Sequence, residues 1–315
     1  MRVLLVNHSS AENELGGAER SLLALGEEWA RREPGLEIEV VTASAEGEFA
    51  RAVRSRGWEL FAVPFWPWAI PHLYRPGENR FDNARRDGRA VLAIEKRIRD
   101  TSPDLVVTNS VVNPWGAVAA GLVGTPHVWF AREFGDLDHG LEFVIGVEQS
   151  WADVGLLSDL VVANSEAVRA HAESFLPGRE VLVTYPPVDV EALRTAPVSA
   201  AAGAAAASAT DARQGGEGTL ELLPVGTVGP ATRQHLAVEA LGELRARGVD
   251  ARLTLVGPLD HPEYHSALLD TAARLGVADR VRVEGYRTDP RPYIRDADVA
   301  LMLSRSEAFG RVTLE

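Results

Sequence analysis

The sequence contains no cysteine, which excludes disulfide bonds and thiolate metal sites. It contains a single lysine, Lys96, so nearly all of its positive charge is carried by arginine. No stretch approaches the roughly 20 apolar residues of a membrane span, and the first apolar run is too short for a signal peptide. We therefore expect a cytoplasmic protein.

An excess of positive charge is also missing, because the formal net charge is −13. Nucleic acid binding needs clustered positive charge, so no nucleic acid partner is expected. Hydrophobic residues make up 46% of the chain and charged residues 24%, a balance typical of a soluble globular protein. The length of 315 residues is sufficient for two domains.

Short apolar runs alternate with helical patterns in the first part of the chain. "RVLLVN" at 2–7 lacks polar–apolar alternation, which predicts a buried strand of a parallel sheet. The next apolar residues recur on one face of a helix: Ala18, Leu22, Leu25 and Trp29. A long helix is predicted at 81–100, and further strands at 36–42, 58–63, 104–108, 127–131, 160–164 and 180–184. This order predicts βαβ units and a parallel sheet.

A small, polar and repetitive stretch at 195–218 interrupts this alternation. It contains too little apolar surface to offset its chain entropy, so we predict a linker or a disordered insertion. The alternation then restarts, with strands predicted at 219–225, 251–257, 280–285 and 298–304. We therefore expect one α/β domain at 1–194 and a second at 219–315. Two such sheets facing each other would bind a ligand in the cleft between them.

The closing stretch, "SRSEAFGRVTLE", places Glu307 and Glu315 eight positions apart. Glu307 lies in the loop after the last predicted strand, and Glu315 lies just over one turn into a helix predicted from Arg311. A helix N-terminus can bind phosphate, and a carboxylate one turn further in can accept hydrogen bonds from ribose hydroxyls. Gly310 would let the backbone approach a ligand closely. The stretch fits a nucleotide sugar, and two solvated surface glutamates are the alternative interpretation.

A glycine pair, Gly16 and Gly17, lies between the first predicted strand and the first predicted helix. Its backbone amides would be able to approach a diphosphate or a sugar. The alternative is that the pair serves only a tight turn.

These segments together resemble a known family. Glu307 and Glu315 match the E-x7-E motif of GT-B-fold retaining glycosyltransferases, in particular glycosyltransferase family 4. The segments "GGAERSLLALGEEWA", "LVVANSEAVRAH" and "VTYPPVD" resemble its first domain, and "LLPVGTVGP", "LTLVGP", "RVRVEGYRTD" and "IRDADVALMLSRSEAFG" its second. The resemblance covers nearly the whole chain. It implies an α/β GT-B architecture of two Rossmann-like domains with parallel sheets facing across a cleft.

The resemblance also implies an activity: sugar transfer from a nucleotide diphosphate sugar to a hydroxyl acceptor, with retention at the anomeric carbon. No metal or other cofactor is implied, because positive side chains and helix dipoles stabilise the departing diphosphate. By position, Glu315 would bind ribose hydroxyls and Glu307 would face the donor sugar. The other donor-binding residues implied are Gly16, Gly17, Gly257, Tyr286, Arg287, Ala308, Phe309 and Gly310. The acceptor, which is a glycan, a lipid-linked molecule or a small molecule, stays open.

One departure from the family concerns the first loop of the second domain, "VGTVGPATRQHL". Relatives usually carry an arginine and a lysine there, both directed at the diphosphate, where this chain has Thr227 and Thr232. A threonine can donate a hydrogen bond, but it cannot neutralise the developing charge. The neighbouring Arg233 is the residue that would replace the missing cations.

A second departure follows the strand at 127–131. Many relatives have a histidine where Arg132 stands. Arg132 is, with Glu307, a candidate catalytic residue that orients an acceptor or contacts the donor, and Glu133 and Asp136 are candidates on the acceptor side. A structural Arg–Glu pair is the alternative interpretation.

An aromatic stretch at 64–74, "PFWPWAIPHLY", is predicted as an acceptor-side loop in which Trp66 and Trp68 contact the acceptor. A packed loop is the alternative. The arginine-rich stretch that follows it would be able to face a membrane as a peripheral contact, but its interspersed acids favour a solvated helix. The D-x-D patterns at 136–138 and 296–298 resemble metal sites of a different glycosyltransferase fold but lie outside that context. No metal is therefore expected.

Two other functions compete with the glycosyltransferase. The threonines at the expected diphosphate site favour a non-catalytic GT-B-like binding protein or an inactive fragment, whereas a GT-B-fold epimerase fits the order of the motifs less well. The helix predicted from Arg311 has only five residues, too few to be stable alone. We therefore expect a chain truncated within its own donor site, with an incomplete second domain.

Overall fold

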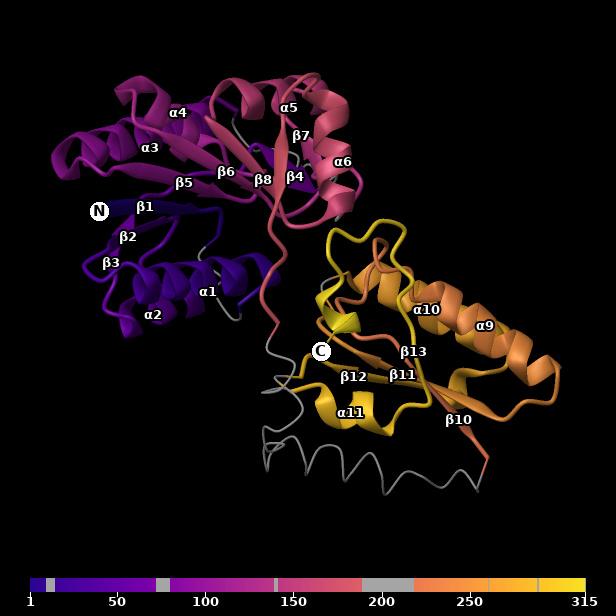
Figure 1. The fold of residues 1–315 in the computed structure, drawn as a ribbon. Helices are drawn as coiled ribbons and strands as arrows, with labels where there is room; N and C mark the ends of the chain where they lie inside the picture. The colour runs from indigo at the N-terminus through magenta and orange to yellow at the C-terminus, as the bar shows by residue number, and fades with distance from the viewer. Residues whose placement is uncertain are drawn as a thin grey trace. The chain divides into compact units, whose positions relative to one another are not determined.

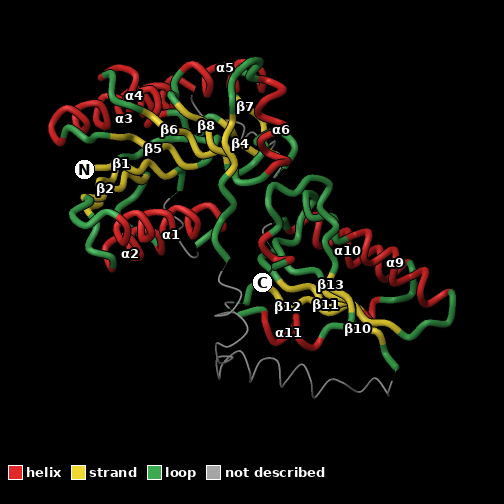
Figure 2. Tube along the Cα trace, viewed as in Figure 1, coloured by secondary structure: helices red, strands yellow, loops and turns green. Residues whose placement is uncertain are grey.

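The computed structural model describes residues 1–9, 15–71, 80–138, 141–188, 218–259, 261–287 and 289–314. The chain divides into two compact units, Met1–Pro187 and Val188–Glu315. Each unit is built on one parallel sheet whose strands alternate with helices (Figure 1, Figure 2). The low-complexity stretch predicted at 195–218 lies outside the described residues, apart from Gly218.

The sheet of the first unit has seven parallel strands in the order β3-β2-β1-β5-β6-β8-β9. Each of them agrees with a predicted strand to within one residue at either end. The strands are Arg2–Asn7 (β1), Glu37–Thr42 (β2), Glu59–Ala62 (β3), Leu105–Asn109 (β5), His127–Ala131 (β6), Leu160–Ala163 (β8) and Val181–Val183 (β9). The prediction succeeds because strands that are buried on both faces are continuous apolar runs.

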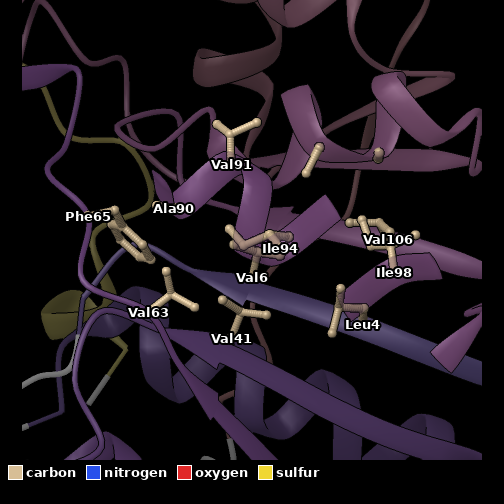
Figure 3. Packing of buried hydrophobic residues seen from close by; sticks show 12 residues of the cluster. Leu4, Val6, Val41, Val63, Phe65, Ala90, Val91, Ile94, Ile98 and Val106 are labelled. Carbon is tan, nitrogen blue, oxygen red and sulfur yellow. The ribbon is translucent and has the colours of Figure 1, made fainter. Parts of the chain in front are cut away.

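Helices cover both faces of this sheet. They are Gly17–Arg32 (α1), Glu48–Ser55 (α2), Arg80–Thr101 (α3), Trp115–Val123 (α4), Val147–Leu156 (α5) and Glu166–Phe175 (α6). Figure 1 shows α3 and α4 on one face and α1 and α2 on the other. Leu4 of β1 packs on the first face with Ile94 and Ile98 of α3 (Figure 3). Leu5, which points the opposite way, packs with Leu22 of α1. Successive side chains of β1 thus point to opposite faces of the sheet, and their burial stabilises the packing of helices on both faces.

A small second sheet in this unit is absent from the sequence prediction. Ala69–Pro71 (β4) pairs antiparallel with Leu141–Phe143 (β7). The backbone amide of Val144 also donates to the carbonyl of Trp68 at 2.8 Å. Strands of three residues are too short to show a period of two, so part of a stretch predicted as a loop is in fact paired.

The second unit has four parallel strands in the order β12-β11-β10-β13. They are Leu220–Leu223 (β10), Ala251–Val256 (β11), Val281–Gly285 (β12) and Val299–Ala300 (β13). The helices are His235–Ala246 (α9), Pro262–Arg274 (α10) and Arg291–Asp296 (α11), with 3-10 turns at Ala278–Arg280 (η1) and Arg311–Thr313 (η2). α9 and α10 pack on one face of this sheet, and α11 packs on the other (Figure 1).

The last strand and the last helix differ from the prediction. The strand predicted at 298–304 pairs only over Val299–Ala300, and two further amides donate to β10, that of Asp298 to Glu221 at 3.0 Å and that of Leu301 to Leu223 at 2.8 Å. β13 is an edge strand, so its outer side has no strand partner within the described residues to extend the ladder. The helix predicted from Arg311 is a 3-10 turn over the residues that are described.

Candidate functional site

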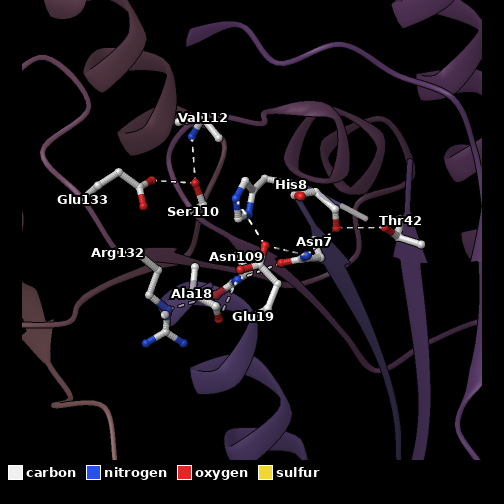
Figure 4. Close-up of polar contacts among 12 residues, drawn as sticks. Asn7, His8, Ala18, Glu19, Thr42, Asn109, Ser110, Val112, Arg132 and Glu133 are labelled. Carbon is white, nitrogen blue, oxygen red and sulfur yellow. Dashed lines mark hydrogen bonds and ion pairs between the residues drawn. The ribbon is translucent and has the colours of Figure 1, made fainter. Parts of the chain in front are cut away.

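Polar side chains converge at the carboxyl edge of the first sheet. Asn7 ends β1, Asn109 ends β5 and Arg132 follows β6, and these strands are neighbours in the sheet. The Asn109 amide donates to Asn7 Oδ1 at 2.9 Å and to the Ala18 carbonyl at 3.3 Å, while its oxygen accepts from Arg132 Nε at 2.9 Å (Figure 4). Asn109 therefore connects both strands to the first turn of α1.

A third asparagine completes this network. Asn164 follows β8, and its side-chain amide donates to the carbonyl of Arg132 at 2.6 Å. Asn7, Asn109 and Asn164 are not among the site residues predicted from the sequence. A signal for them exists, because three of the predicted strands run into asparagine: "RVLLVN", "LVVTN" and "LVVAN".

Arg132 is a buried cation whose terminal guanidinium nitrogens lack a partner among the described residues. Its side chain is only 8% exposed, and its guanidinium lies 4.6 Å from the centre of the Phe130 ring. Burial lowers the pKa of Arg132 to about 10, which leaves it charged at neutral pH. Nε is bound to Asn109, but neither terminal nitrogen has a hydrogen-bond partner among the described residues.

Glu133 turns away from the asparagine network and binds the turn that follows β5. Its carboxylate accepts from the Ser110 hydroxyl at 2.6 Å (Figure 4). It also accepts from the Val111 amide at 2.6 Å. Ser110 has a φ of 79°, a strained value for a residue other than glycine, so Glu133 secures this turn. Burial raises the pKa of Glu133 to about 7, with a smaller contribution from the negative charge of Asp138. Arg132 and Glu133 thus have separate partners, and no direct ion pair joins them in the described structure.

Asp136 and Asp138 hold the loop that follows Arg132. Asp138 accepts from the amides of Phe134 and Gly135 at 3.0 and 2.9 Å. Asp136 lies 2.7 Å from Nε2 of His171, whose ring is in edge contact with Phe134. In the part of the chain that is described, no three acidic or histidine side chains are grouped to hold a metal ion.

The loop before α1 brings Gly16 close to a buried acid. A Cβ on Gly16 would lie 2.7 Å from Oε2 of Glu19, so a larger residue there would displace that carboxylate. Glu19 Oε1 lies 3.4 Å from His8 Nε2 and 3.5 Å from Asn7 Nδ2. Burial lowers the pKa of His8 below its ordinary value, although Glu19 opposes this shift. Gly16 and Gly17 thus sit beside the polar network.

The two tryptophans predicted on the acceptor side differ. Trp68 is buried, its ring stacks on Trp129 with 6.0 Å between centroids, and Nε1 donates to the Val111 carbonyl at 2.5 Å. These contacts favour the packed-loop interpretation for Trp68. Trp66 is 37% exposed, and the guanidinium of Arg86 lies 5.0 Å from its ring centre.

In the second unit, the closing stretch follows β13. Glu307 is exposed, and its Oε1 accepts from the Gly310 amide at 3.1 Å. Gly310 has a φ of 73°, which only glycine adopts without strain. Ala308 and Phe309 between them are half-buried. Glu315 lies outside the described residues, so its predicted contact with ribose stays a prediction.

The loop after β10 is fastened by its own side chains. Thr232 Oγ1 donates to the Thr227 carbonyl at 2.5 Å, and the buried Gln234 amide donates to the same oxygen at 3.0 Å. Gly257, after β11, has a φ of 152°, and a Cβ there would lie 1.9 Å from the carbonyl oxygen of Gly226. The Thr232 hydroxyl thus stabilises the loop through bonds within it, a role that the sequence does not predict.

Arg233 in this loop has a side chain without a partner. Its φ is 57° and its backbone amide donates to the Gly229 carbonyl at 3.1 Å, but its guanidinium makes no hydrogen bond or ion pair with the residues described. Arg305, which sequence reasoning missed, follows β13 on the neighbouring strand and is likewise without such a partner in the described ranges. Arg287 is not free, because it pairs with Glu284 at 2.6 Å and donates to the Tyr293 hydroxyl at 3.1 Å. Tyr286 beside it is 43% exposed.

Two family profiles match the chain, one mostly within each of the two units. The sequence profile of Glycosyltransferase Family 4 matches residues 15–192, more than half of the chain. The chain belongs to Glycosyltransferase Family 4. The profile of Glycosyl transferases group 1 matches residues 220–315.

Individual relatives agree with this assignment. The chain is 32% identical over 182 residues to a D-inositol 3-phosphate glycosyltransferase of Thermobispora bispora. The match covers 55% of this chain and 40% of the relative, so it spans less than half the length of that protein. Among solved structures, Anabaena Alr3699/HepE in complex with UDP has a TM-score of 0.69 at 19% identity, covering 99% of this chain and 77% of the other. A glycosyltransferase from Rickettsia africae has a TM-score of 0.69 at 17% identity, covering 99% and 75%.

These structural likenesses confirm the predicted GT-B class, with two Rossmann-like units of which the second is smaller. The identities are low, so the likeness is one of fold. None of the helices in the described ranges is both long and apolar enough to cross a bilayer.

Proposed function

We propose that this protein is a retaining glycosyltransferase that moves a sugar from a nucleotide diphosphate sugar to a hydroxyl acceptor. The observation that carries the proposal is the carboxyl edge of the second sheet, where Glu307 and Gly310 follow β13 and the unpaired Arg233 follows β10. The Anabaena neighbour was solved with UDP-glucose, so a UDP-sugar is the first donor to test. The acceptor side is assigned to the first unit, with Arg132 and the exposed Trp66.

The proposed reaction needs no protein nucleophile. The acceptor oxygen bonds to the anomeric carbon as the bond from that carbon to the diphosphate oxygen breaks, and this oxygen takes the hydroxyl proton. Attack and departure on the same face retain the configuration. Arg233 offsets the charge that develops on the diphosphate, and the Glu307 carboxylate faces the donor sugar, where positive charge develops at the anomeric carbon. These cationic and backbone groups supply what a metal would, so we propose metal-independent transfer.

Mass spectrometry with a panel of donors tests this proposal. UDP-, GDP- and ADP-sugars are incubated with glycan, lipid-linked and small hydroxyl acceptors, with and without EDTA. We expect one donor class to give a glycosylated product, in equal yield with EDTA present. The absence of any product, together with no binding of UDP, GDP or ADP in isothermal titration calorimetry, would overturn the assignment.

A non-catalytic binding protein is the second candidate, and Thr227 and Thr232 favour it. These residues stand where relatives carry cations, and the Thr232 hydroxyl is used within its own loop. Nucleotide binding in calorimetry without turnover of any donor would support this candidate over the enzyme.

A further inference from the structure

The two terminal nitrogens of the Arg132 guanidinium, here called the fork, have no hydrogen-bond partner among the described residues. Its side chain is more than nine-tenths buried, and the only hydrogen bond of its guanidinium in the described structure is the one from Nε to Asn109. Two other arginines of the same unit, both half-buried, use their terminal nitrogens. Those of Arg179 donate to the carbonyls of Gly155 and Ser158. Arg97 binds two carboxylates. The terminal nitrogens of Arg132 are therefore available to donate hydrogen bonds to a ligand.

Among the described residues no carboxylate forms an ion pair with the Arg132 guanidinium, although the negative charge of nearby Glu133 opposes the lowering of the Arg132 pKa by burial. The neighbouring carboxylates are committed elsewhere: Glu133 to Ser110 and Val111, Asp136 to His171, and Asp138 to two backbone amides. A buried charge without a partner is destabilising, and the cost falls when an anion arrives. The two terminal nitrogens of Arg132 thus have no hydrogen-bonded anionic partner among the described residues.

The fork is also held in position. Asn109 fixes Nε and is itself bound to Asn7 and to the first turn of α1, and the Phe130 ring lies against the guanidinium. A planar guanidinium held at Nε presents its two terminal nitrogens to a ligand, a geometry that matches two oxygens of one phosphate or carboxylate.

We propose that Arg132 is the subsite for an anionic group, a phosphate or a carboxylate, carried by the acceptor. The inference rests on the proposed function, in which the first unit binds the acceptor and the second unit binds the donor. It narrows the open acceptor class from any hydroxyl compound to one with a negatively charged substituent.

Intrinsic fluorescence tests this subsite, because all seven tryptophans lie within residues 1–187. Trp129 reports on the site, since its Nε1 donates to the carbonyl of Ser110, next to Asn109. The probes are inorganic phosphate, and glucose 6-phosphate compared with glucose. In the wild type, we expect phosphate to bind and glucose 6-phosphate to bind at least tenfold better than glucose. Arg132→Met should abolish both effects, and Arg132→Lys should retain part of them.

Arg233→Met is the matched control, because it removes from a loop of the second unit another arginine whose side chain has no partner among the described residues. It should weaken UDP binding in calorimetry and leave the preference for glucose 6-phosphate unchanged, whereas Arg132→Met should do the reverse. Loss of the preference in Arg233→Met but not in Arg132→Met would place the anion on the donor side and overturn the proposal. Equal binding of glucose and glucose 6-phosphate by the wild type would also overturn it. Transfer to a neutral acceptor would then leave the glycosyltransferase standing while this subsite fails.

Discussion

The carboxyl edges of the two sheets are built in different ways. In the first unit the edge consists of buried side chains that bind one another, with Asn109 at the centre between Asn7 and Arg132. In the second unit the edge consists largely of loop backbone, with the exposed Glu307 bound to the Gly310 amide and the half-buried Arg233 side chain unpaired in the described residues. A buried polar network positions groups strictly and tolerates little change, because each unpaired member costs free energy. An edge lined by backbone depends instead on glycines and loop conformation.

The largest expected effect tests the dependence of the second unit on close backbone contact. Gly257→Ala would place a Cβ 1.9 Å from the Gly226 oxygen at a φ of 152°, so we expect the second unit to lose about 4 kcal/mol or more. Gly276→Ala is the control, because Gly276 also has a positive φ but nothing lies within 4 Å of its Cβ position. It should cost about 1 kcal/mol.

Urea denaturation followed by circular dichroism measures this loss. Tryptophan fluorescence reports on the first unit alone and should give an unchanged transition. Equal stabilities of the two glycine variants would contradict the close contact.

The second effect tests the buried network of the first unit. Burial raises the pKa of Glu133 from 4.5 to about 7, with Asp138 adding to the rise and Ser110, Val111 and Arg132 opposing it. The folded state therefore binds more protons than the unfolded state between these values, so this residue lowers the free energy of unfolding as pH rises from about 4.5 to about 7. The difference is worth about 3 kcal/mol and is constant above that range.

Glu133→Gln should remove this dependence. Urea unfolding at pH 5, 6 and 8, followed by tryptophan fluorescence, should show the variant gaining on the wild type as pH rises. Glu148→Gln, on the surface of the same unit, should give a constant difference. A constant difference for Glu133→Gln as well would show that Glu133 does not titrate in this window.

The two edges also differ in how far the sequence predicts them. Glu307 and Gly310 are contiguous, so a local motif identifies them. Asn7 and Asn109 are separated by about a hundred residues, and they meet only because β1 and β5 are neighbours in the sheet. The repeated asparagine at strand ends is a usable signal, but sheet order decides which of these residues touch. The strands themselves were predictable because they are apolar runs.

Adjacent aromatic and charged residues show the same limit at short range. Trp66 and Trp68 are two positions apart in the same aromatic stretch, and the sequence does not distinguish their roles. In the structure, Trp66 is exposed and Trp68 stacks on Trp129. Arg132 and Glu133 are consecutive but turn to different partners. Direction at a loop depends on backbone angles such as the φ of 79° at Ser110, which residue type does not determine.

The third effect tests the exposed carboxylate of the second edge. Glu307→Ala should lower the rate of transfer about a hundredfold or more and change UDP affinity much less, because the charge is needed where the anomeric carbon becomes positive. Glu307→Gln separates this role from the bond to the Gly310 amide, which a glutamine oxygen can still accept. Both variants should transfer sugar more slowly, and only Glu307→Ala should remove the hydrogen bond that holds the loop at Gly310. Equal loss of transfer and of UDP affinity would reject the assigned role.

The smallest effect concerns Arg233, where charge and backbone strain can be separated. Arg233→Met removes the charge at the same φ of 57°, and we expect UDP affinity in calorimetry to fall about tenfold, or about 1.4 kcal/mol. Arg233→Gly should lose the same affinity but raise the stability of the second unit by about 1 kcal/mol, because glycine adopts this φ without strain. If the second edge is shaped for its ligand at the expense of stability, the two variants must diverge in this way. Unchanged UDP affinity in both variants would show that the strain is merely structural and that the missing cations at Thr227 and Thr232 have no replacement in this loop.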